Sequence, residues 1–208
     1  MSSFARRFLD DSRAVLARVD EGRIEAVAAT IAATRDHGGR LFLCGSGGGA
    51  GHASHAAADF RKLTGIETYS VTDNVSELTA RINDDGWESS YARWLEVSRV
   101  NRNDCLFVFS VGGGDRERAV SPNLVEAMHL AAEREAAIVG IAGRDGGELA
   151  RVATAYVLIP TVDPALVTPQ AEGFQALIWH LLVSHPLLAT SPAKWESMTE
   201  TNSPGTSA

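Results

Sequence analysis

Short apolar runs alternate with amphipathic segments along most of the chain. Five runs consist mainly of apolar residues, and each is followed by a glycine or a polar turn: they span residues 41–44, 68–71, 106–109, 138–141 and 156–159. Strands that are apolar on both faces are typical of a parallel sheet that helices cover on both sides. The alternation of these runs with helical segments predicts an α/β fold with a doubly wound, five-stranded parallel sheet.

Apolar residues spaced three and four positions apart predict the helices. Two of them, over residues 3–18 and 22–36, precede the first strand, and we expect them to form an N-terminal helical arm, residues 1–38. Six more belong to an α/β domain, residues 39–188: they span 50–63, 75–83, 87–98, 122–135, 147–152 and 170–184. Residues 189–208 are rich in Ser, Thr, Pro and Glu, so we expect a disordered tail there.

Composition and charge narrow the range of functions. A chain of 208 residues can bury a full core without disulfides. The net charge of −7 argues against general nucleic-acid binding, which needs a basic face. We find no apolar stretch of membrane-spanning length and no signal peptide. Cys44 and Cys105 lie in apolar runs and are expected to be reduced core residues. We therefore expect a cytoplasmic protein with neither nucleic-acid nor membrane partners.

Glycine clusters follow three of the predicted strands, at residues 45–51, 112–114 and 143–147. Ligands of doubly wound sheets bind at the carboxyl ends of strands, where glycine permits close approach and helix N-termini attract anions. With Ser46 and Ser110 in the first two loops, the pattern predicts a phosphate site. A nicotinamide-binding turn is the alternative, with Asp73 as the ribose-binding acid. That alternative leaves the second loop and the histidines described next without a role.

Histidines and carboxylates form a second group of polar residues. His55 and Asp59 lie four positions apart on the helix after the first glycine loop, a spacing that can place both side chains on one ion or substrate. The last predicted helix carries Glu172 and His180 among apolar residues. Each pair alone also fits a surface hydrogen bond or a packed core residue.

Taken together, the motifs resemble the sedoheptulose 7-phosphate isomerases (phosphoheptose isomerases) of the sugar-isomerase (SIS) fold. The matching segments are residues 44–48 with His55 and Asp59, 73–79, 83–84, 121–123, 143–147 and 168–180. They cover about residues 5–188 in the family's order. The resemblance implies a flavodoxin-like three-layer sandwich. It also implies isomerisation of sedoheptulose 7-phosphate to D-glycero-D-manno-heptose 7-phosphate through an enediolate, which feeds nucleotide-activated heptose synthesis.

The resemblance also implies roles for single residues. Substrate contacts fall on Ser46, Gly47, Gly48, Asn83 and Asp84, and phosphate contacts on Ser110, Gly112 and Ser121. A zinc site falls on His55, Asp59, Glu172 and His180, of which Asp59 and Glu172 also contact substrate. Asp59 is then the catalytic base and His180 the acid. The family forms tetramers with active sites between subunits.

Four departures from the family pattern change these expectations. Asp59 replaces Glu, Glu172 replaces Gln and becomes a rival for the base, Gly49 replaces Ser, and residues 115–120 are inserted before Ser121. Arg116 or Arg118 of this insert could compensate for the hydroxyl missing at position 49.

Helix geometry limits how the zinc ligands can meet. With Thr168 as N-cap and Pro169 as the first helical residue, Glu172 and His180 share one helix and lie about 12 Å apart along its axis. They cannot then reach the same ion. Either Glu172 precedes the helix, or the two residues come from neighbouring subunits.

Two other functions remain open. One is a non-catalytic SIS protein that binds a phosphosugar or associates with a replication initiator. The other is an isomerase of a different phosphosugar, such as a hexulose, pentulose or octulose phosphate. We favour catalysis because a binding protein needs no set of acid, base and metal ligands.

Overall fold

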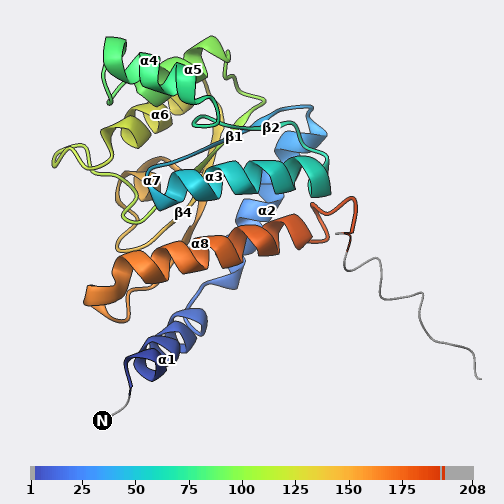
Figure 1. The fold of residues 1–208 in the computed structure, drawn as a ribbon. Coiled ribbons are helices and arrows are strands. Elements are labelled where there is room, and N and C mark those ends of the chain that lie inside the picture. The colour runs from blue at the N-terminus through green and yellow to red at the C-terminus, as the bar shows by residue number, and fades with distance from the viewer. Residues whose placement is uncertain (1–2, 193, 195–208) are drawn as a thin grey trace, which may run out of the picture.

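The computed structural model describes residues 3–192 and 194 and shows a five-stranded parallel sheet between two layers of helices (Figure 1). The strands are β1 (Leu41–Gly45), β2 (Thr68–Ser70), β3 (Cys105–Ser110), β4 (Ala137–Ala142) and β5 (Ala155–Leu158). Their order in the sheet is β2-β1-β3-β4-β5, and all neighbours are parallel. The predicted doubly wound α/β fold is confirmed, with every strand end within one residue of its expected position.

Helices cover both faces of the sheet. The elements are α1 (Phe4–Leu16), α2 (Glu21–Asp36), α3 (Gly48–Asp59), the π-helical turn η1 (Phe60–Thr64), α4 (Val75–Asp85), α5 (Ser90–Val97), α6 (Pro122–Glu133), α7 (Gly147–Val152), the 3-10 turn η2 (Pro164–Leu166) and α8 (Val167–Ser184). Alternate strand residues face opposite layers. Leu41 and Phe107 pack with α2, α3 and α8, while Phe42 and Leu106 pack with α5, α6 and α7. Both faces of the central strands β1, β3 and β4 are buried, which explains their continuous apolar runs. At the two sides of the sheet, β2 exposes Tyr69 and β5 is partly exposed.

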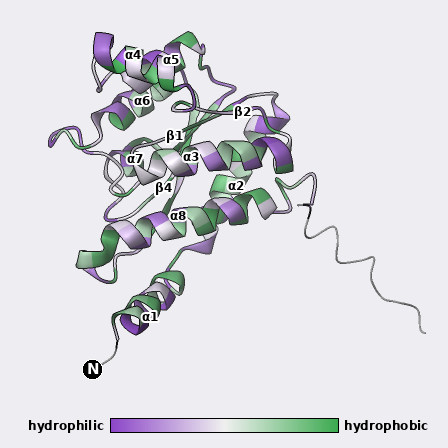
Figure 2. Cartoon of the chain, in the orientation of Figure 1, coloured by the Kyte–Doolittle hydropathy of each residue, from purple (hydrophilic) through white to green (hydrophobic). Residues whose placement is uncertain are grey.

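The two N-terminal helices differ in how they pack. Helix α2 lies against β4 and β5 and buries Ile24, Val27 and Ile31, so it is a layer of the sandwich. Only α1 projects from the domain (Figure 1). Its hydrophobic residues Phe4 and Leu9 are exposed, and apolar positions are visible along it in Figure 2.

Several helix boundaries differ from the sequence prediction by two or three residues; the helix expected over 87–98, for example, begins at Ser90. Three larger differences concern α8, α3 and the end of the chain. Helix α8 begins at Val167 because η2 runs directly into it. The Asp163 carboxylate, which accepts from the Ala165 N–H at 2.8 Å, caps η2, and α8 has no side-chain cap at Thr168. The segment 50–63 is not one α-helix, since its end forms η1. The Thr190 N–H donates to the Leu63 carbonyl at 2.8 Å, so the ordered chain continues past position 189. The rest of the expected tail, apart from Ser191, Pro192 and Lys194, lies outside the described residues.

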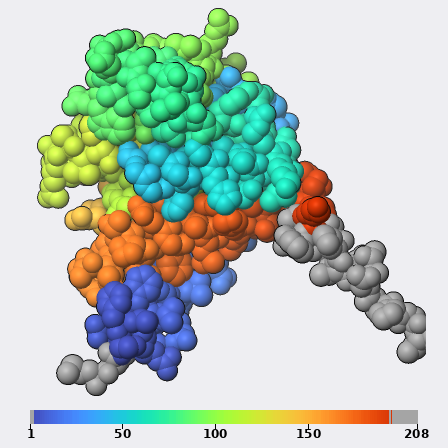
Figure 3. All heavy atoms as spheres, in the orientation of Figure 1, coloured from blue at the N-terminus to red at the C-terminus, as the bar shows by residue number. Residues whose placement is uncertain are grey.

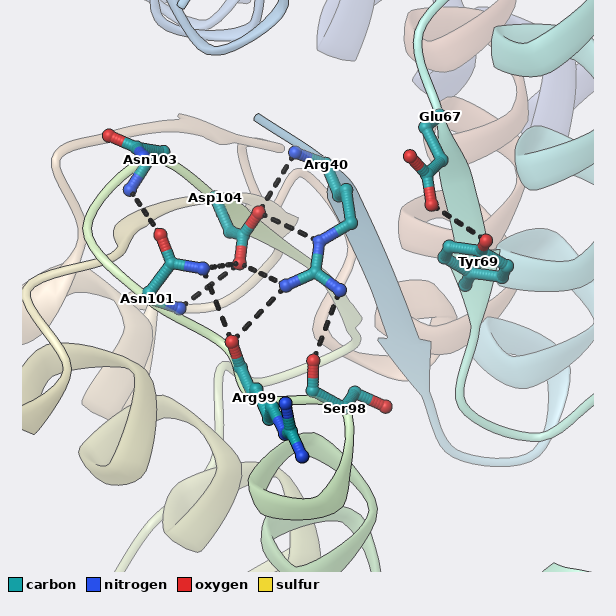
Figure 4. Close-up of polar contacts among 8 residues, drawn as sticks. All are labelled: Arg40, Glu67, Tyr69, Ser98, Arg99, Asn101, Asn103 and Asp104. Carbon is teal, nitrogen blue, oxygen red and sulfur yellow. Dashed lines mark hydrogen bonds and ion pairs between the residues drawn. The ribbon is translucent and has the colours of Figure 1, made fainter. Parts of the chain in front are cut away.

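At the amino ends of the strands, opposite the glycine loops, Arg40 and Asp104 form an ion pair (Figure 4). Asp104, at the start of β3, is 2% exposed and accepts hydrogen bonds from Arg40 Nε at 3.1 Å and Nη2 at 2.8 Å. Its carboxylate also accepts from the backbone N–H groups of Arg40 and Asn101. The hydrogen bond to Asp104 raises the pKa of Arg40. The cluster joins the starts of β1 and β3.

None of the helices in the described part of the chain combines the length and the apolar character that crossing a membrane requires.

Candidate active site

Helices α3 and α8 lie side by side and form adjacent bands on one face of the molecule (Figure 3). They run in the same direction, so successive turns meet: the Glu172 carboxylate lies by Gly48, Gln175 by His52, and Trp179 by His55. Gln175 is buried, accepts from His52 Nδ1 at 3.0 Å and donates to the Ser110 carbonyl at 2.9 Å. This amide therefore fixes both helices to the carboxyl end of β3.

His55, Asp59 and His180 form a triad at the far end of this helix pair. One ligand atom of each lies within 4.8 Å of the others. Asp59 Oδ2 is 3.8 Å from His55 Nε2 and 3.9 Å from His180 Nε2. His180 Nδ1 donates to the Ala176 carbonyl at 2.7 Å, which leaves Nε2 on the side of the ring that faces Asp59. The triad therefore presents two imidazole nitrogens and a carboxylate to one point.

Trp179 orients both imidazoles. It is 1% exposed, its ring stacks on His180 with centroids 3.5 Å apart, and His55 meets it edge-on at 4.7 Å. The side chains of His55 and His180 themselves are 63% and 53% exposed. Two imidazoles and a carboxylate held on a rigid wall, with an open side, can bind a divalent ion and leave a position for a further ligand.

Glu172 does not join the triad within one chain. Helix α8 starts before it, so Glu172 and His180 lie eight residues apart on one helix, about 12 Å along the axis. This excludes the alternative in which Glu172 precedes the helix. A Cβ atom at Gly48 would be 2.6 Å from Glu172 Oε1, so the carboxylate lies directly over the start of α3. Glycine at position 48 is what lets it lie there.

A cavity of about 200 Å³ lies at the carboxyl ends of β1 and β3. Its lining includes Ser46, a predicted substrate contact, and the predicted phosphate contacts Ser110, Gly112 and Ser121. The other lining residues are Phe109, Val111, Val120, Leu124 and Arg144. Ser110 Oγ accepts from the Gly113 N–H at 2.9 Å, and Ser46 Oγ accepts from Asn123 Nδ2 at 3.1 Å. Both hydroxyls thus keep their own protons to donate to a ligand.

Two local features complete this cavity. Ser121 adopts a left-handed conformation with φ +51° and ends the loop at the N-terminus of α6, whose partial positive charge favours an anion. The hydroxyl of Tyr91 donates to the Gly45 carbonyl at 2.8 Å and so helps to fix the start of the first glycine loop. Burial raises the pKa of Tyr91 to about 12, so this donor keeps its proton.

Other predicted residues lie elsewhere. Gly47 is the left-handed N-cap of α3, with φ +58°. Asn83 and Asp84 are exposed on α4, where the Asn83 amide donates to Asp84 at 2.7 Å, and neither lines the cavity. Along α3, eleven residues separate Gly48 from Asp59, about 16 Å. The cavity and the triad of one chain therefore stand at opposite ends of α3.

The expected compensation by the inserted loop is not seen. Residues 115 and 120 close the insert with an antiparallel bridge, and Arg118 is 79% exposed and paired with Asp115. Neither Arg116 nor Arg118 lines the 200 Å³ cavity. A Cβ atom at Gly49 would be 2.8 Å from the Phe109 carbonyl oxygen, so close packing of α3 on β3 explains the glycine there. The arginine on the cavity wall is Arg144, to which the sequence assigned no role.

Comparisons with known proteins identify the family. The sequence profile of the SIS domain matches residues 7–143. The chain belongs to the SIS-domain family. Over 194 residues, this SIS-domain chain is 37% identical to the lincomycin biosynthesis protein LmbN of Streptomyces lincolnensis, covering 88% of this chain and 69% of that protein.

Two further relatives of this SIS-domain chain carry the name of an isomerase. The phosphoheptose isomerase of Helicobacter hepaticus is 30% identical over 164 residues, which is 76% of this chain and 78% of that enzyme. The structure of phosphoheptose isomerase GmhA from Neisseria gonorrhoeae superposes with a TM-score of 0.73 and 25% identity, covering 86% of this chain and 94% of the other. These relatives support assignment to the phosphosugar isomerases.

Proposed function

We propose that this protein isomerises a ketose phosphate to an aldose phosphate in the cytoplasm, with sedoheptulose 7-phosphate as substrate and D-glycero-D-manno-heptose 7-phosphate as product. The observation that carries the proposal is the convergence of His55, Asp59 and His180 in a chain of the SIS-domain family. A protein that only binds a phosphosugar has no use for a carboxylate between two imidazoles.

The triad fits a zinc ion. His55 Nε2, Asp59 Oδ2 and His180 Nε2 are of the types that zinc takes in catalytic sites, and the hydrogen bond from His180 Nδ1 to Ala176 is the support that such a ligand has. A zinc ion held there would supply positive charge to stabilise the oxygen anion of the enediolate.

The chain's own groups account for the proton transfers. Isomerisation moves a proton between C1 and C2 and another between the two oxygens, so it needs a base and an acid. Asp59 is the proposed base, with Glu172 as the rival. His180 is the proposed acid when Nε2 is protonated, with Nδ1 anchored on Ala176. His180 cannot be acid and metal ligand at the same moment. Substitution of His180 would remove a proton donor if it is the acid, and a metal-binding group if it is the ligand.

We propose that subunits of a homotetramer complete each other's sites. The separation of about 16 Å along α3 between cavity and triad supports this, because a single sugar phosphate must touch both. Glu172, Asn83 and Asp84 would then reach the triad or the cavity of a neighbour. The exposed apolar residues Phe4 and Leu9 on α1 offer a contact surface for such a neighbour.

Turnover of sedoheptulose 7-phosphate, measured as aldose phosphate formed, tests the proposed function. We expect His180→Gln and Asp59→Asn each to lower kcat by about 10²- to 10⁴-fold. The matched control is His37→Gln, an exposed histidine at the end of α2. Hexulose, pentulose and octulose phosphates form the substrate panel. Binding of these sugars without turnover by the wild-type protein would instead identify a non-catalytic binding protein.

A further inference from the structure

Arg144 lies where three hollows meet at the carboxyl edge of the sheet. It lines the 200 Å³ cavity with Ser46, Ser110 and Ser121. It also lines a hollow of about 400 Å³ bounded by residues 161–168 and one of about 130 Å³ bounded by the inserted loop. Alone among the described residues, Arg144 borders all three.

The backbone of Arg144 is held in a conformation that non-glycine residues rarely adopt, with φ +56°. Neighbouring contacts impose it: the Gly143 N–H donates to the Val111 carbonyl at 3.0 Å, and the Gly146 N–H donates back to the Gly143 carbonyl at 3.0 Å. Strained backbone of this kind occurs mainly at active sites and ligand-binding sites, where the surrounding structure holds it in place. Here its effect is to hold the stem of an arginine beside the glycine loop after β3.

Gly112 leaves room for that stem. A Cβ atom at position 112 would be 3.3 Å from Arg144 Cδ, so any side chain there would crowd the arginine. The loop itself, Val111-Gly112-Gly113, contains no hydroxyl or charge. The 200 Å³ cavity therefore draws its hydroxyl donors from Ser46, Ser110 and Ser121, and its cationic side chain from Arg144.

Two other arginines in this region each pair with an acidic side chain, whereas Arg144 pairs with none in the part of the chain that the structure describes. Arg118 pairs with Asp115 at 3.7 Å, and Arg151 pairs with Glu148 at 3.0 Å. The guanidinium of Arg144 makes no hydrogen bond or ion pair with any described residue. Arg144 lines the same cavity as three serines and the N-terminus of α6, and a guanidinium has the donors and the charge that a phosphoryl group takes, often through two parallel hydrogen bonds.

We propose that Arg144 binds the phosphoryl group of the substrate and so positions the sugar, a role that rests on the proposed function. It supplies the charge that the glycine loops lack. Because this interaction is the same in the substrate and the transition state, losing it weakens binding and leaves the proton transfers intact.

The test compares Arg144→Gln, Arg144→Lys and Arg144→Asn with the control Arg118→Gln. Asn is included because it tolerates a positive φ, which keeps the turn intact while removing the charge. Two quantities are measured: the dissociation constant of inorganic phosphate by calorimetry, and KM and kcat for sedoheptulose 7-phosphate. Thermal unfolding checks that each variant is folded.

We expect the Gln and Asn variants to raise both the phosphate dissociation constant and KM by about 10- to 100-fold, with kcat within about threefold of wild type. Lys should lie between them and wild type, and Arg118→Gln should change nothing. If the wild-type protein binds phosphate through Arg144 but turns over no sugar, the proposed function fails and the phosphate site stands. If the Asn variant binds phosphate as tightly as wild type, or the wild type binds none, the proposal for Arg144 is wrong.

Discussion

The buried carboxylate of Asp104 allows a prediction whose size follows from the structure. Arg40→Ala removes two side-chain hydrogen bonds from this carboxylate, those from Nε and Nη2, together with the opposite charge beside a group that is 2% exposed in the folded protein. Each hydrogen bond to a charged group contributes about 1.5–3 kcal/mol. We therefore expect the free energy of unfolding to fall by about 3–5 kcal/mol, the usual cost of removing one partner from a buried pair. The midpoint of thermal unfolding should fall by about 6–20 °C.

Urea denaturation followed by circular dichroism measures this loss. The control is Arg93→Ala, which breaks an ion pair of similar length, 3.0 Å, whose side chains are 59% and 44% exposed. We expect the control to lose no more than about 0.5 kcal/mol because solvent screens the exposed pair. The ion pair of Arg40 lies at the opposite edge of the sheet from the glycine loops, so KM should not change while the variant is folded. A loss below about 1 kcal/mol for Arg40→Ala would refute the reasoning.

Three more predictions concern the site and its surroundings. Gly48→Ala should displace the Glu172 carboxylate and lower kcat/KM. The control Gly51→Ala, where a Cβ atom meets open space, should leave kcat/KM unchanged and raise the unfolding midpoint by about 2–4 °C, because alanine favours a helix more than glycine does. Equal kinetics for the two variants would contradict a role for Glu172. Chelation of the purified protein should remove about one zinc per chain and most of the activity, and added zinc should restore the activity. Elemental analysis should find less metal in His55→Gln. Full activity after complete chelation would contradict the metal assignment. Cys44 and Cys105 should resist alkylation at about pH 8 until the protein is unfolded, because both are fully buried. Burial also raises the pKa of Cys44 and brings the pKa of Cys105 to about 12. Rapid labelling of the folded protein would show that the core opens.

The central strands β1, β3 and β4 could be predicted from the sequence because both of their faces are buried. The run at residues 138–141 shows this, since Ile138 packs into one core and Val139 into the other. The elements against which a helix packs are harder to predict from the sequence. The apolar spacing of α2 indicates that one face is buried, but only the structure shows that β4 and β5 cover it. The start of α8 was missed because η2 precedes it without a break.

The candidate site could be predicted in part. His55, Asp59 and His180 come together as expected, since helix spacing and the contact of α3 with α8 suffice. The roles of Asn83, Asp84 and Glu172 are predicted from motif resemblance alone, and a motif carries no information on which chain of an assembly uses it. The left-handed backbone of Arg144 leaves one signal in the sequence, the glycines around it, and they point equally well to a simple turn.

Isomerisation of sedoheptulose 7-phosphate in deuterium oxide tests the central claim most directly. Proton transfer through Asp59 predicts that the wild-type protein forms the aldose phosphate with solvent deuterium at C2, because a partly exposed carboxylate, 23% accessible, exchanges its proton with solvent. Asp59→Asn should form both the product and the label at least about 10²-fold more slowly. Proton magnetic resonance of the product measures both. Absence of the aldose phosphate with the wild-type protein, or an aldose phosphate without deuterium at C2, would contradict the account.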